Sequence, residues 1–487
     1  MKVKNKQFLV ASSLLFVFLA AAIGCSKKST SGVQPVNPVT PVTPVKTDVS
    51  MWLTTPDRQS LLQKQNISLL FGTSTNQNPT INVDTTQTYQ SIDGFGFALT
   101  GGSATLINQL PTAQQGPLLT ELFGTDSTSI GISYLRISIG ASDLSASDFT
   151  YDDVTDATGT DVNLKNFSIS MEQTDLIPIL KKILAINPSI KIIATPWTAP
   201  SWMKSNNSFS QGSLDTAYYN VYAQYFVKYI QAMQQQGITV TAITPQNEPL
   251  NANNNPSMVM QPTEEDNFVK NSLGPAFTNA GLTTKIIVYD HNADRTDYPL
   301  TILADQAAYQ YVDGSAFHLY AGDISALTPV HTAYPNKNLY FTEIYTASTG
   351  SFSGDLAWHL NNIIIGATRN WCKNVIEWNL ASDPNFGPHT SGGCSTCQGA
   401  LTIGSFISRN VSYYIIAHAS KFVRPGAVRI ASDVNTTLPN VAFKNPDGSK
   451  VLIVLNTATN AQAFNIKFNS KIVTTTLNAG AVATYKW

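Results

Sequence analysis

Two glutamates in this 487-residue sequence each follow a short apolar segment that has the pattern of a β-strand. Glu248 follows the segment 241–245, and Glu343 follows the segment 339–342. If these segments are the fourth and seventh strands of one parallel barrel, the two carboxylates face each other across its mouth. Hydrolysis of a glycosidic bond needs such a pair, one carboxyl protonated and the other ionised, and a separation of ~5–5.5 Å gives retention. Joint placement therefore makes Glu248 and Glu343 the candidate catalytic residues.

The elements that must hold this pair are predicted from an alternation of apolar runs with longer helical stretches. The stretch 218–236 is rich in helix formers and stops at Gly237, a residue favoured just after a helix. Its tyrosines are expected to pack the helix. The repetition predicts an α/β fold, a (β/α)8 TIM barrel, over residues 88–422. The eight strand-like segments are 91–99, 134–139, 191–196, 241–245, 285–290, 315–318, 339–342 and 375–379.

The C-terminal part of the chain has a different pattern. Two alternating segments flank the turn Asn445-Pro446-Asp447-Gly448, which predicts a β-hairpin. We therefore expect a side β-sandwich formed by residues 423–487 and completed by strands from an N-terminal segment, residues 49–87. Further strand-like segments are 80–84, 462–468, 472–477 and 481–485.

Six motifs, in this order along the chain, resemble those of glycoside hydrolase family 30, the glucosylceramidase-like family. The resemblance runs from about residue 80 to the C-terminus. It implies a retaining β-glycoside hydrolase that acts on β-glucosidic linkages through a covalent glycosyl-enzyme, with no metal and no cofactor. The motifs are IDGFGFALTGGSA (92–104), YLRISIGASD (134–143), TPWTAPSWMK (195–204), Asn247-Glu248, Glu343 and VIEWNLASDPNFGPH (375–389).

The same resemblance implies a role for each matching residue. Glu248 is the expected acid/base and Glu343 the expected nucleophile. Arg136 is expected beneath Glu343, keeping it ionised, and Asn247 is expected to bind the sugar 2-hydroxyl. The remaining expected site residues are Trp197 and Trp378 as apolar walls for the sugar, His318 and Tyr320 as groups that orient the carboxylates, and His291 as a weaker candidate.

Fewer residues indicate which branch of the family the chain resembles, and so which substrate is expected. Animal glucosylceramidases carry an Asp that contacts the glucose where this chain has Gly101, and the segment GGCSTCQG (392–399) resembles a branch that includes endo-β-1,6-glucanases. A β-glucan or glucoside is therefore the expected substrate. The alternatives are a β-xylanase or another family 30 specificity, and a non-catalytic carbohydrate-binding lipoprotein. Asp93 is a further acid expected near the mouth.

The composition excludes several other classes of function. Lys and Arg number 30 against 31 Asp and Glu, so the net charge is −1, and no basic surplus exists for nucleic acid. Only 13% of residues are charged, whereas 43% are hydrophobic, which excludes a disordered chain. We expect a monomer with a large core.

The N-terminus resembles a bacterial lipoprotein signal. Lys2, Lys4 and Lys6 precede an apolar run that is short for a membrane span, and Ala22-Ile23-Gly24 leads into Cys25. We expect a signal peptide at 1–24, lipid on Cys25, a Pro-rich linker at 25–48 and attachment to the membrane of the cell envelope. The alternative is an ordinary signal peptide in which the cysteine is incidental.

Three other cysteines remain. Cys394 and Cys397 could close a local disulfide, and Cys372 would then be a buried free thiol. A metal site is the weaker interpretation, because one C-x-x-C supplies only two ligands. Glu377 neighbours Trp378 on a strand, so it should point to the opposite face. Trp202 is equally consistent with the core and with the site.

Overall fold

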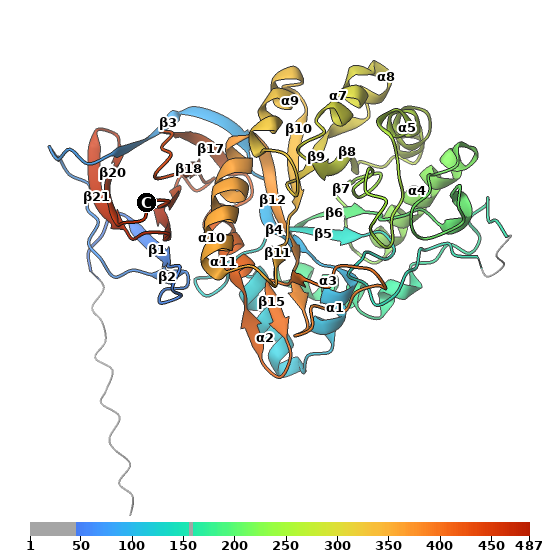
Figure 1. The fold of residues 1–487 in the computed structure, drawn as a ribbon, viewed down its shortest axis with the longest axis horizontal. Coiled ribbons are helices and arrows are strands. Elements are labelled where there is room, and N and C mark those ends of the chain that lie inside the picture. The colour runs from blue at the N-terminus through green and yellow to red at the C-terminus, as the bar shows by residue number, and fades with distance from the viewer. Residues whose placement is uncertain (1–44, 155–158) are drawn as a thin grey trace, which may run out of the picture. The chain divides into compact units, whose positions relative to one another are not determined.

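The computed structural model describes residues 45–154 and 159–487, and its centre is a closed barrel of eight parallel strands (Figure 1). Each of the eight predicted segments contributes one strand. Around the barrel the order is β4 (Gly94–Ala98), β5 (Tyr134–Ser138), β6 (Lys191–Thr195), β7 (Ala242–Ile243), β8 (Lys285–Asn292), β9 (Val312–His318), β10 (Asn338–Glu343) and β12 (Cys372–Asn379).

Helices between the strands cover the outside of the barrel. The predicted helix at 218–236 is α4 (Tyr219–Gln235), and Tyr222 and Tyr225 on it are fully buried in the core, as expected. Two π-helical segments, η4 (Val269–Leu273) and η6 (Leu360–Ala367), continue neighbouring helices. The other helices are α1 (Gly101–Asn108), α2 (Thr112–Phe123), α3 (Leu176–Ile186), α5 (Pro262–Phe268), α6 (Gly274–Asn279), α7 (Asp297–Ala304), α8 (Gln306–Tyr309), α9 (Leu327–Ala333), α10 (Phe352–His359) and α11 (Val411–Ser420).

The interior of the barrel is layered. An apolar layer contains Tyr134, Ile193, Ile287 and Ile376 from different strands. Side chains alternate along a strand, so Arg136, two residues beyond Tyr134 on β5, points to the same side and is fully buried. The barrel therefore carries a charged layer directly above an apolar one, at the end where its strands finish.

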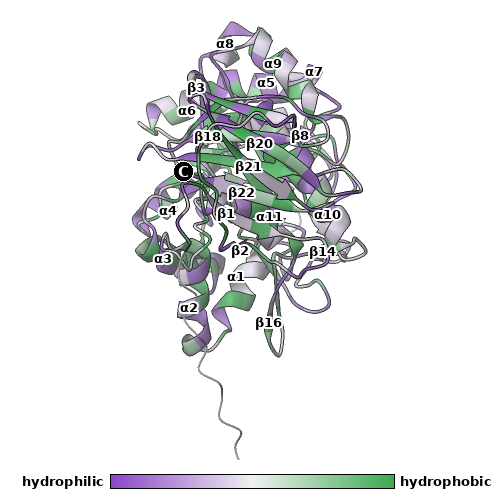
Figure 2. Cartoon of the chain, turned by 90° about the vertical axis from the view of Figure 1, so that its left-hand side faces the viewer, coloured by the Kyte–Doolittle hydropathy of each residue, from purple (hydrophilic) through white to green (hydrophobic). Residues whose placement is uncertain are grey.

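The side domain is a β-sandwich of nine strands, in the order β2-β1-β22-β19-β18-β17-β3-β20-β21. Figure 2 shows hydrophobic residues gathered in these strands, whereas the loops around them are largely hydrophilic. As predicted, N-terminal strands complete it. Its strands are β1 (Ser50–Thr54), β2 (Gln63–Lys64), β3 (Thr80–Ser91), β17 (Val428–Ser432), β18 (Asn440–Lys444), β19 (Lys450–Leu455), β20 (Gln462–Phe468), β21 (Lys471–Leu477) and β22 (Val482–Lys486).

Two details differ from the sequence expectations. β3 runs to Ser91, past the expected boundary between 87 and 88, because it pairs with β17 from Val83 to Ser91.

Asp93 comes just before β4, so it lies at the opposite end of the barrel from the mouth. There its carboxylate binds Lys191 Nζ at 2.7 Å and lies 3.7 Å from Lys373 Nζ, both near strand beginnings. Asp93 is a structural ion-pair partner.

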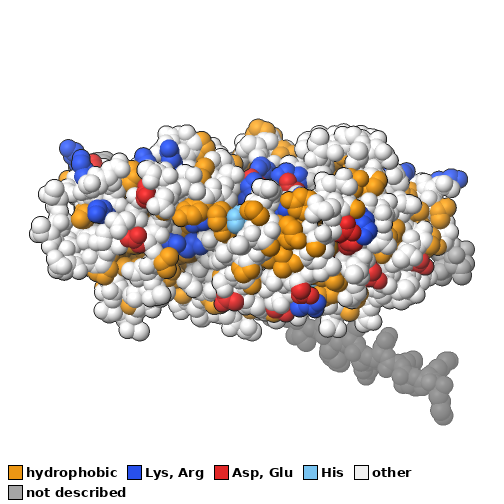
Figure 3. All heavy atoms as spheres, turned by 90° about the horizontal axis from the view of Figure 1, so that it is seen from above, with side chains coloured by type: hydrophobic (Ala, Val, Ile, Leu, Met, Phe, Trp, Pro, Cys, Tyr) orange, Lys and Arg blue, Asp and Glu red, His pale blue; other side chains and the backbone are white. Residues whose placement is uncertain are grey.

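The outer surface carries few charges. Figure 3 shows charged side chains, singly and in small groups, scattered among hydrophobic and other side chains on one face, as the composition implies. Among residues 45–154 and 159–487, no helix is long and apolar enough to cross a bilayer. The expected signal peptide at 1–24, Cys25 and most of the linker at 25–48 lie outside the described residues.

Candidate active site

A cavity of about 510 Å³ opens where the barrel strands end. Its wall comes from the ends of β8, β10 and β12 and from the loops after β5, β7, β9, β10 and β12, which is where a TIM barrel places its chemistry. The residues used below that line it are Asp143, Glu248, Asn251, His291, Tyr320, Glu343, Trp378, Cys394 and Cys397.

Glu248 and Glu343 meet in this cavity. Glu343 is the last residue of β10, and Glu248 lies in the loop after β7. One carboxylate oxygen of each lies within 4.8 Å of the other, and both residues are over nine-tenths buried. The predicted facing arrangement is confirmed. The distance matches the close spacing of a pair that works by retention rather than the ~6.5–9.5 Å of an inverting pair.

The backbone at Glu248 adopts an unusual conformation. Its φ is +43°, in the left-handed region that a non-glycine residue seldom occupies, at a cost of roughly 1–2 kcal/mol. A hydrogen bond from Glu248 N–H to the Asp290 carbonyl, 3.0 Å long, holds this turn. Asn251 Nδ2 donates to Glu248 Oε2 at 2.7 Å. The loop is therefore bent so that the carboxylate turns into the cavity.

Arg136 holds the other carboxylate. Its Nη1 donates to Glu343 Oε2 at 2.5 Å, and its Nη2 contacts Asn247 Oδ1 at 2.7 Å and Asp290 Oδ2 at 2.9 Å. Tyr320 OH donates to Glu343 Oε1 at 2.9 Å. Burial raises the pKa of Glu343, and the positive charges of His318 and Arg136 oppose that rise. Both oxygens of Glu343 are thus fixed in direction.

His318 connects Glu248 to a carboxylate below it. Nδ1 lies 3.1 Å from Glu248 Oε1, and Nε2 lies 3.1 Å from Asp290 Oδ1. Burial alone would lower the pKa of His318, but the charge of Glu343 and the hydrogen bonds to Asp290 and Glu248 raise it to about 9. Burial would likewise raise the pKa of Glu248, but the hydrogen bond and charge of His318 lower it to about 2. Of these two groups, His318 therefore carries the proton and Glu248 is ionised.

Two tryptophans lie beside this network, in different positions. Trp378 lines the cavity, as expected for an apolar wall. Trp197 does not line it: its ring lies 5.3 Å from that of Trp378, and Arg136 Cζ lies 4.9 Å from its centroid. Trp197 therefore supports Trp378 and Arg136 from behind. Trp202 belongs to the core, where its Nε1 donates to the Asp152 carbonyl.

Two acids that were given no role in the sequence reasoning belong to the site. Asp290 is fully buried beneath the cavity, where the charge of Arg136 and the hydrogen bond from His318 overcome burial and lower its pKa. Asp143 lines the cavity, and burial with the charges of Glu343 and Glu248 raises its pKa to about 7. Both lie in segments that the sequence analysis singled out: Asp290 is the last residue of the strand-like segment 285–290, beside His291, and Asp143 is the last residue of the motif 134–143. The available signal was their position, Asp290 near the end of the fifth barrel strand and Asp143 just after the second.

Three further expectations can be compared with the geometry. His291 lines the cavity with Nε2 4.0 Å from Glu248 Oε1. Gly101 begins α1 and does not line the cavity, and the third carboxyl group in the cavity wall is that of Asp143. Glu377 points away from the cavity, as predicted, and hydrogen-bonds His359 Nδ1 at 2.7 Å.

Glu248, His318 and Glu343 are close enough to hold a metal ion, since one donor atom from each lies within 4.8 Å of the others. Their donor atoms already have partners, however: Arg136 and Tyr320 bind Glu343, and Asn251 binds Glu248. The buried charge of Arg136 also repels a cation. The arrangement suits proton transfer and attack on carbon better than metal binding.

Comparisons with known proteins agree with this geometry. Residues 92–423 match the glycosyl hydrolase family 30 TIM-barrel domain, and residues 426–485 match that family's β-sandwich domain. An endo-1,6-β-D-glucanase of Neurospora crassa is 37% identical over 75% of this chain and 79% of its own length. The lysosomal acid glucosylceramidase of Mus musculus is 29% identical over 82% and 81%. The solved structure of the endo-β1,6-glucanase BT3312 shares 39% identity and a TM-score of 0.84 over 91% of this chain and 99% of that one. The carboxylate pair thus lies in the barrel of a glycosidase, and this chain belongs to glycosyl hydrolase family 30.

Proposed function

We propose that this glycosidase is an endo-acting β-1,6-glucanase that retains configuration at the cleaved bond. The fungal endo-1,6-β-D-glucanases of Neurospora crassa and Aspergillus fumigatus, at 37% and 36% identity, and BT3312, at 39%, support this choice over a glucosylceramidase. The mouse glucosylceramidase is less similar, at 29%.

The structural observation that carries the proposal is the polar wall on the Glu248 side of the cavity. The acid that protonates a leaving group lies next to it, so this wall surrounds the leaving group. Asn251, Asn253 and Asn254 line it from the loop after β7, and Asn292 lines it from the end of β8. Amides donate and accept hydrogen bonds, as sugar hydroxyls do, and would be poorly satisfied by the apolar chains of a ceramide. The wall fits a sugar as leaving group.

The first chemical step forms a covalent intermediate. A Glu343 carboxylate oxygen attacks the anomeric carbon as the bond to the glycosidic oxygen breaks, and that oxygen takes the bonding electrons and a proton from Glu248. In the second step Glu248 removes a proton from water. The water oxygen attacks the anomeric carbon, and the Glu343 carboxylate is released. Two displacements leave the configuration unchanged.

The proton for the first step is shared by Glu248 and His318. Glu248 Oε1 and His318 Nδ1 are 3.1 Å apart, so one proton can lie on either atom. With the proton on Glu248, His318 is neutral and keeps its Nε2 hydrogen toward Asp290. A bound sugar displaces water, and loss of solvation favours this neutral pair over the ion pair. Substrate binding therefore moves the proton to the atom that must deliver it.

The test is hydrolysis of pustulan, a β-1,6-linked glucan, compared with glucosylceramide and an aryl β-glucoside. We expect pustulan to be cleaved to oligosaccharides of mixed length early in the reaction, with the β-anomer formed first in NMR spectra. Turnover of glucosylceramide without cleavage of pustulan would overturn the substrate proposal. Glucose as the only early product would overturn the endo mode, and an α-anomer would overturn retention.

We also propose that Cys25 carries lipid and attaches the enzyme to a bacterial cell envelope. The support is the sequence of residues 1–25 and the Pro-rich segment that follows it. Incorporation of labelled palmitate into the full chain, and its loss in Cys25→Ser, is the expected result. An unlabelled, soluble wild-type protein would contradict it. Two further statements stay predictions: that the enzyme is a monomer, and that it needs no cofactor.

A further inference from the structure

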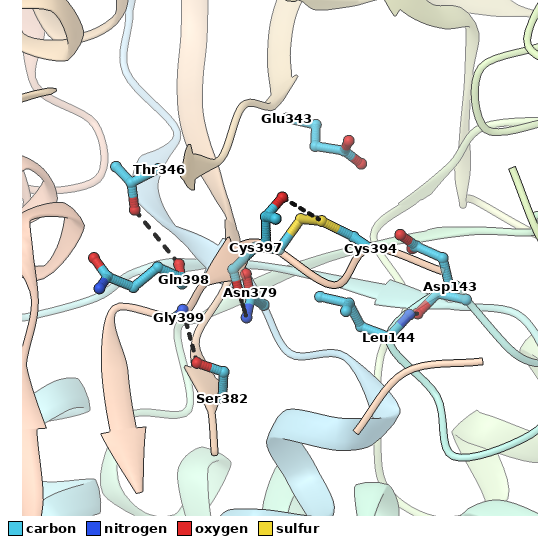
Figure 4. The surroundings of a disulfide bond; sticks show 12 residues. Asp143, Leu144, Glu343, Thr346, Asn379, Ser382, Cys394, Cys397, Gln398 and Gly399 are labelled. Atoms are coloured by element: carbon cyan, nitrogen blue, oxygen red, sulfur yellow. Dashed lines mark hydrogen bonds between the residues drawn. A yellow bond between two sulfur atoms is a disulfide. The ribbon is translucent and has the colours of Figure 1, made fainter. Parts of the chain in front are cut away.

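We infer that the Cys394–Cys397 disulfide is a positioning element of the active site, because it holds the Asp143 carboxylate at a fixed place in the cavity opposite Glu343. The two cysteines, three positions apart in the sequence, form a disulfide, and both line the cavity. Figure 4 shows the bond lying between the segment of Asp143 and Leu144 and the strand that carries Cys397. The inference needs glycosidase activity but does not depend on β-1,6 specificity.

One side of the disulfide is connected to Asp143. Thr390 N–H donates to the Asp143 carbonyl at 2.9 Å, and the backbone N–H of Cys394 lowers the pKa of the Asp143 carboxyl. Gly393 lies so close that an added Cβ would be 2.3 Å from that carbonyl oxygen. The segment 390–394 is therefore fitted against the backbone of Asp143, and only a glycine allows the approach.

The other side is connected to the strand end that carries Glu343. β14 (Cys397–Gln398) pairs with β11 (Thr346–Ala347), with Ala347 opposite Cys397. Ser348 N–H also donates to the Thr396 carbonyl at 2.9 Å. Since β11 begins three positions after Glu343, this short sheet follows the nucleophile directly. The disulfide therefore links the segment that positions Asp143 to the segment that positions Glu343.

Asp143 has an open place for a ligand. Its side chain lines the cavity, the residue is 6% exposed, and Oδ1 is buried with no hydrogen-bond partner. A buried acceptor without a partner is costly unless something else supplies a donor. A sugar hydroxyl entering the cavity is such a donor. The disulfide thus matters to substrate binding through Asp143.

Stabilisation of the whole fold is a weaker explanation of the bond. The restriction that a cross-link imposes on an unfolded chain grows with the length of the closed loop, and this loop is very short. Cys397 is almost completely buried beside Leu144, Trp197 and Trp378, so the sulfurs lie in the wall of the site rather than in either large core.

The experiment compares the oxidised enzyme with enzyme reduced by a phosphine, using an aryl β-glycoside that the wild type hydrolyses. Loss of one charged hydrogen bond to the sugar predicts a KM about tenfold higher on reduction, with kcat changed less than about threefold. Cys394→Ser/Cys397→Ser should reproduce that KM and not respond to the reductant. Cys372→Ala, which keeps the disulfide, should respond as the wild type does.

Two further readouts separate positioning from a structural role. The Cys394 N–H lowers the pKa of Asp143, so losing it should move the acidic limb of kcat/KM to higher pH. Asp143→Asn should raise KM by itself and make KM insensitive to reduction, because both changes remove one interaction. Unchanged KM after reduction, additive effects of reduction and Asp143→Asn, or a melting temperature lowered by more than about 10 °C would each overturn the inference.

Discussion

The mouth of the barrel and the seam between barrel and sandwich each contain a fully buried histidine; the one at the mouth is charged, whereas the one at the seam is neutral. At the mouth, carboxylates of Glu248 and Asp290 accept from His318, and the pKa of His318 rises to about 9. At the seam, His418 on α11 lies between the hydroxyls of Thr54 and Thr484, and burial lowers its pKa to about 3. Both histidines are fully buried, so the groups that hydrogen-bond each ring decide whether it is charged.

The two regions also differ in how completely their polar atoms are satisfied. Both ring nitrogens of His418 have a hydroxyl partner. At the mouth, Asp143 Oδ1 and His291 Nδ1 are buried without any partner. Unsatisfied buried groups are rare because they are costly, and they gather where a ligand will satisfy them. At the seam, the protein itself supplies every hydrogen-bond partner of His418. At the mouth, Asp143 Oδ1 and His291 Nδ1 find a partner only when substrate binds.

The largest expected effect is on the chemistry at the mouth. Glu343→Gln should lower kcat/KM by more than about 10⁴-fold, and Glu248→Gln by about 10²–10⁴-fold, because the nucleophile and the proton donor are lost. Steady-state kinetics on an aryl β-glucoside measures both. Glu377→Gln is the matched control, since this glutamate is equally buried but faces His359, and it should stay within about threefold of wild type. Comparable losses in all three variants would contradict the assignment.

Exchanging the two histidines for neutral side chains should affect different properties. His318→Gln should lower kcat/KM about 100-fold, because Glu248 loses the group that shares its proton. His418→Leu should leave kcat/KM within about threefold of wild type and lower the free energy of unfolding by about 1–2 kcal/mol, because two buried hydrogen bonds are removed. Kinetics and urea denaturation are measured on both. If His418→Leu impaired catalysis as strongly as His318→Gln, the contrast between the regions would be wrong.

The smallest expected effect is on stability between pH 7 and 9. The pKa of His318 is raised above its unfolded value of 6.5, so its contribution is full below that value and is lost as pH rises through about 9. The His318 contribution to the unfolding free energy, measured as the difference between wild type and His318→Gln, should therefore fall by roughly 2 kcal/mol over this range. His418, whose pKa is lowered, contributes nothing to this change. The fall should persist in His418→Leu and flatten in His318→Gln, and a fall of equal size in both variants would count against a charged His318.

Features that depend on local pattern were predictable. Hydrophobic alternation located all eight barrel strands, and their order placed Glu248 and Glu343 at facing strand ends. Asp93 was misplaced because it was assigned inside a strand that begins only at Gly94, so the direction from strand start to strand end was lost. Trp197 was expected to be a wall for the sugar because a motif shows that a ring is near a site but not which of two neighbouring rings faces the cavity.

The contacts among the charged side chains of the site could not be predicted from the sequence. Asp290 reaches both Arg136 and His318, three residues from three different strands, and such a contact depends on side-chain directions across the barrel. The positive φ of Glu248 is likewise set by tertiary contacts, since nothing in a glutamate favours it. The sequence pattern therefore located the groups, and only the folded structure showed which of them contact one another.

The pairing of β1 with β22 has a consequence for how the protein is made. Five residues of β1, from Ser50 to Thr54, lie against five of β22, from Val482 to Lys486. A ribosome therefore produces one partner more than four hundred residues before the other. Throughout that interval the early strand keeps an open edge, a template for wrong pairing with other chains. Because contacts between distant parts of a chain form slowly, closure of this edge is a late step in folding.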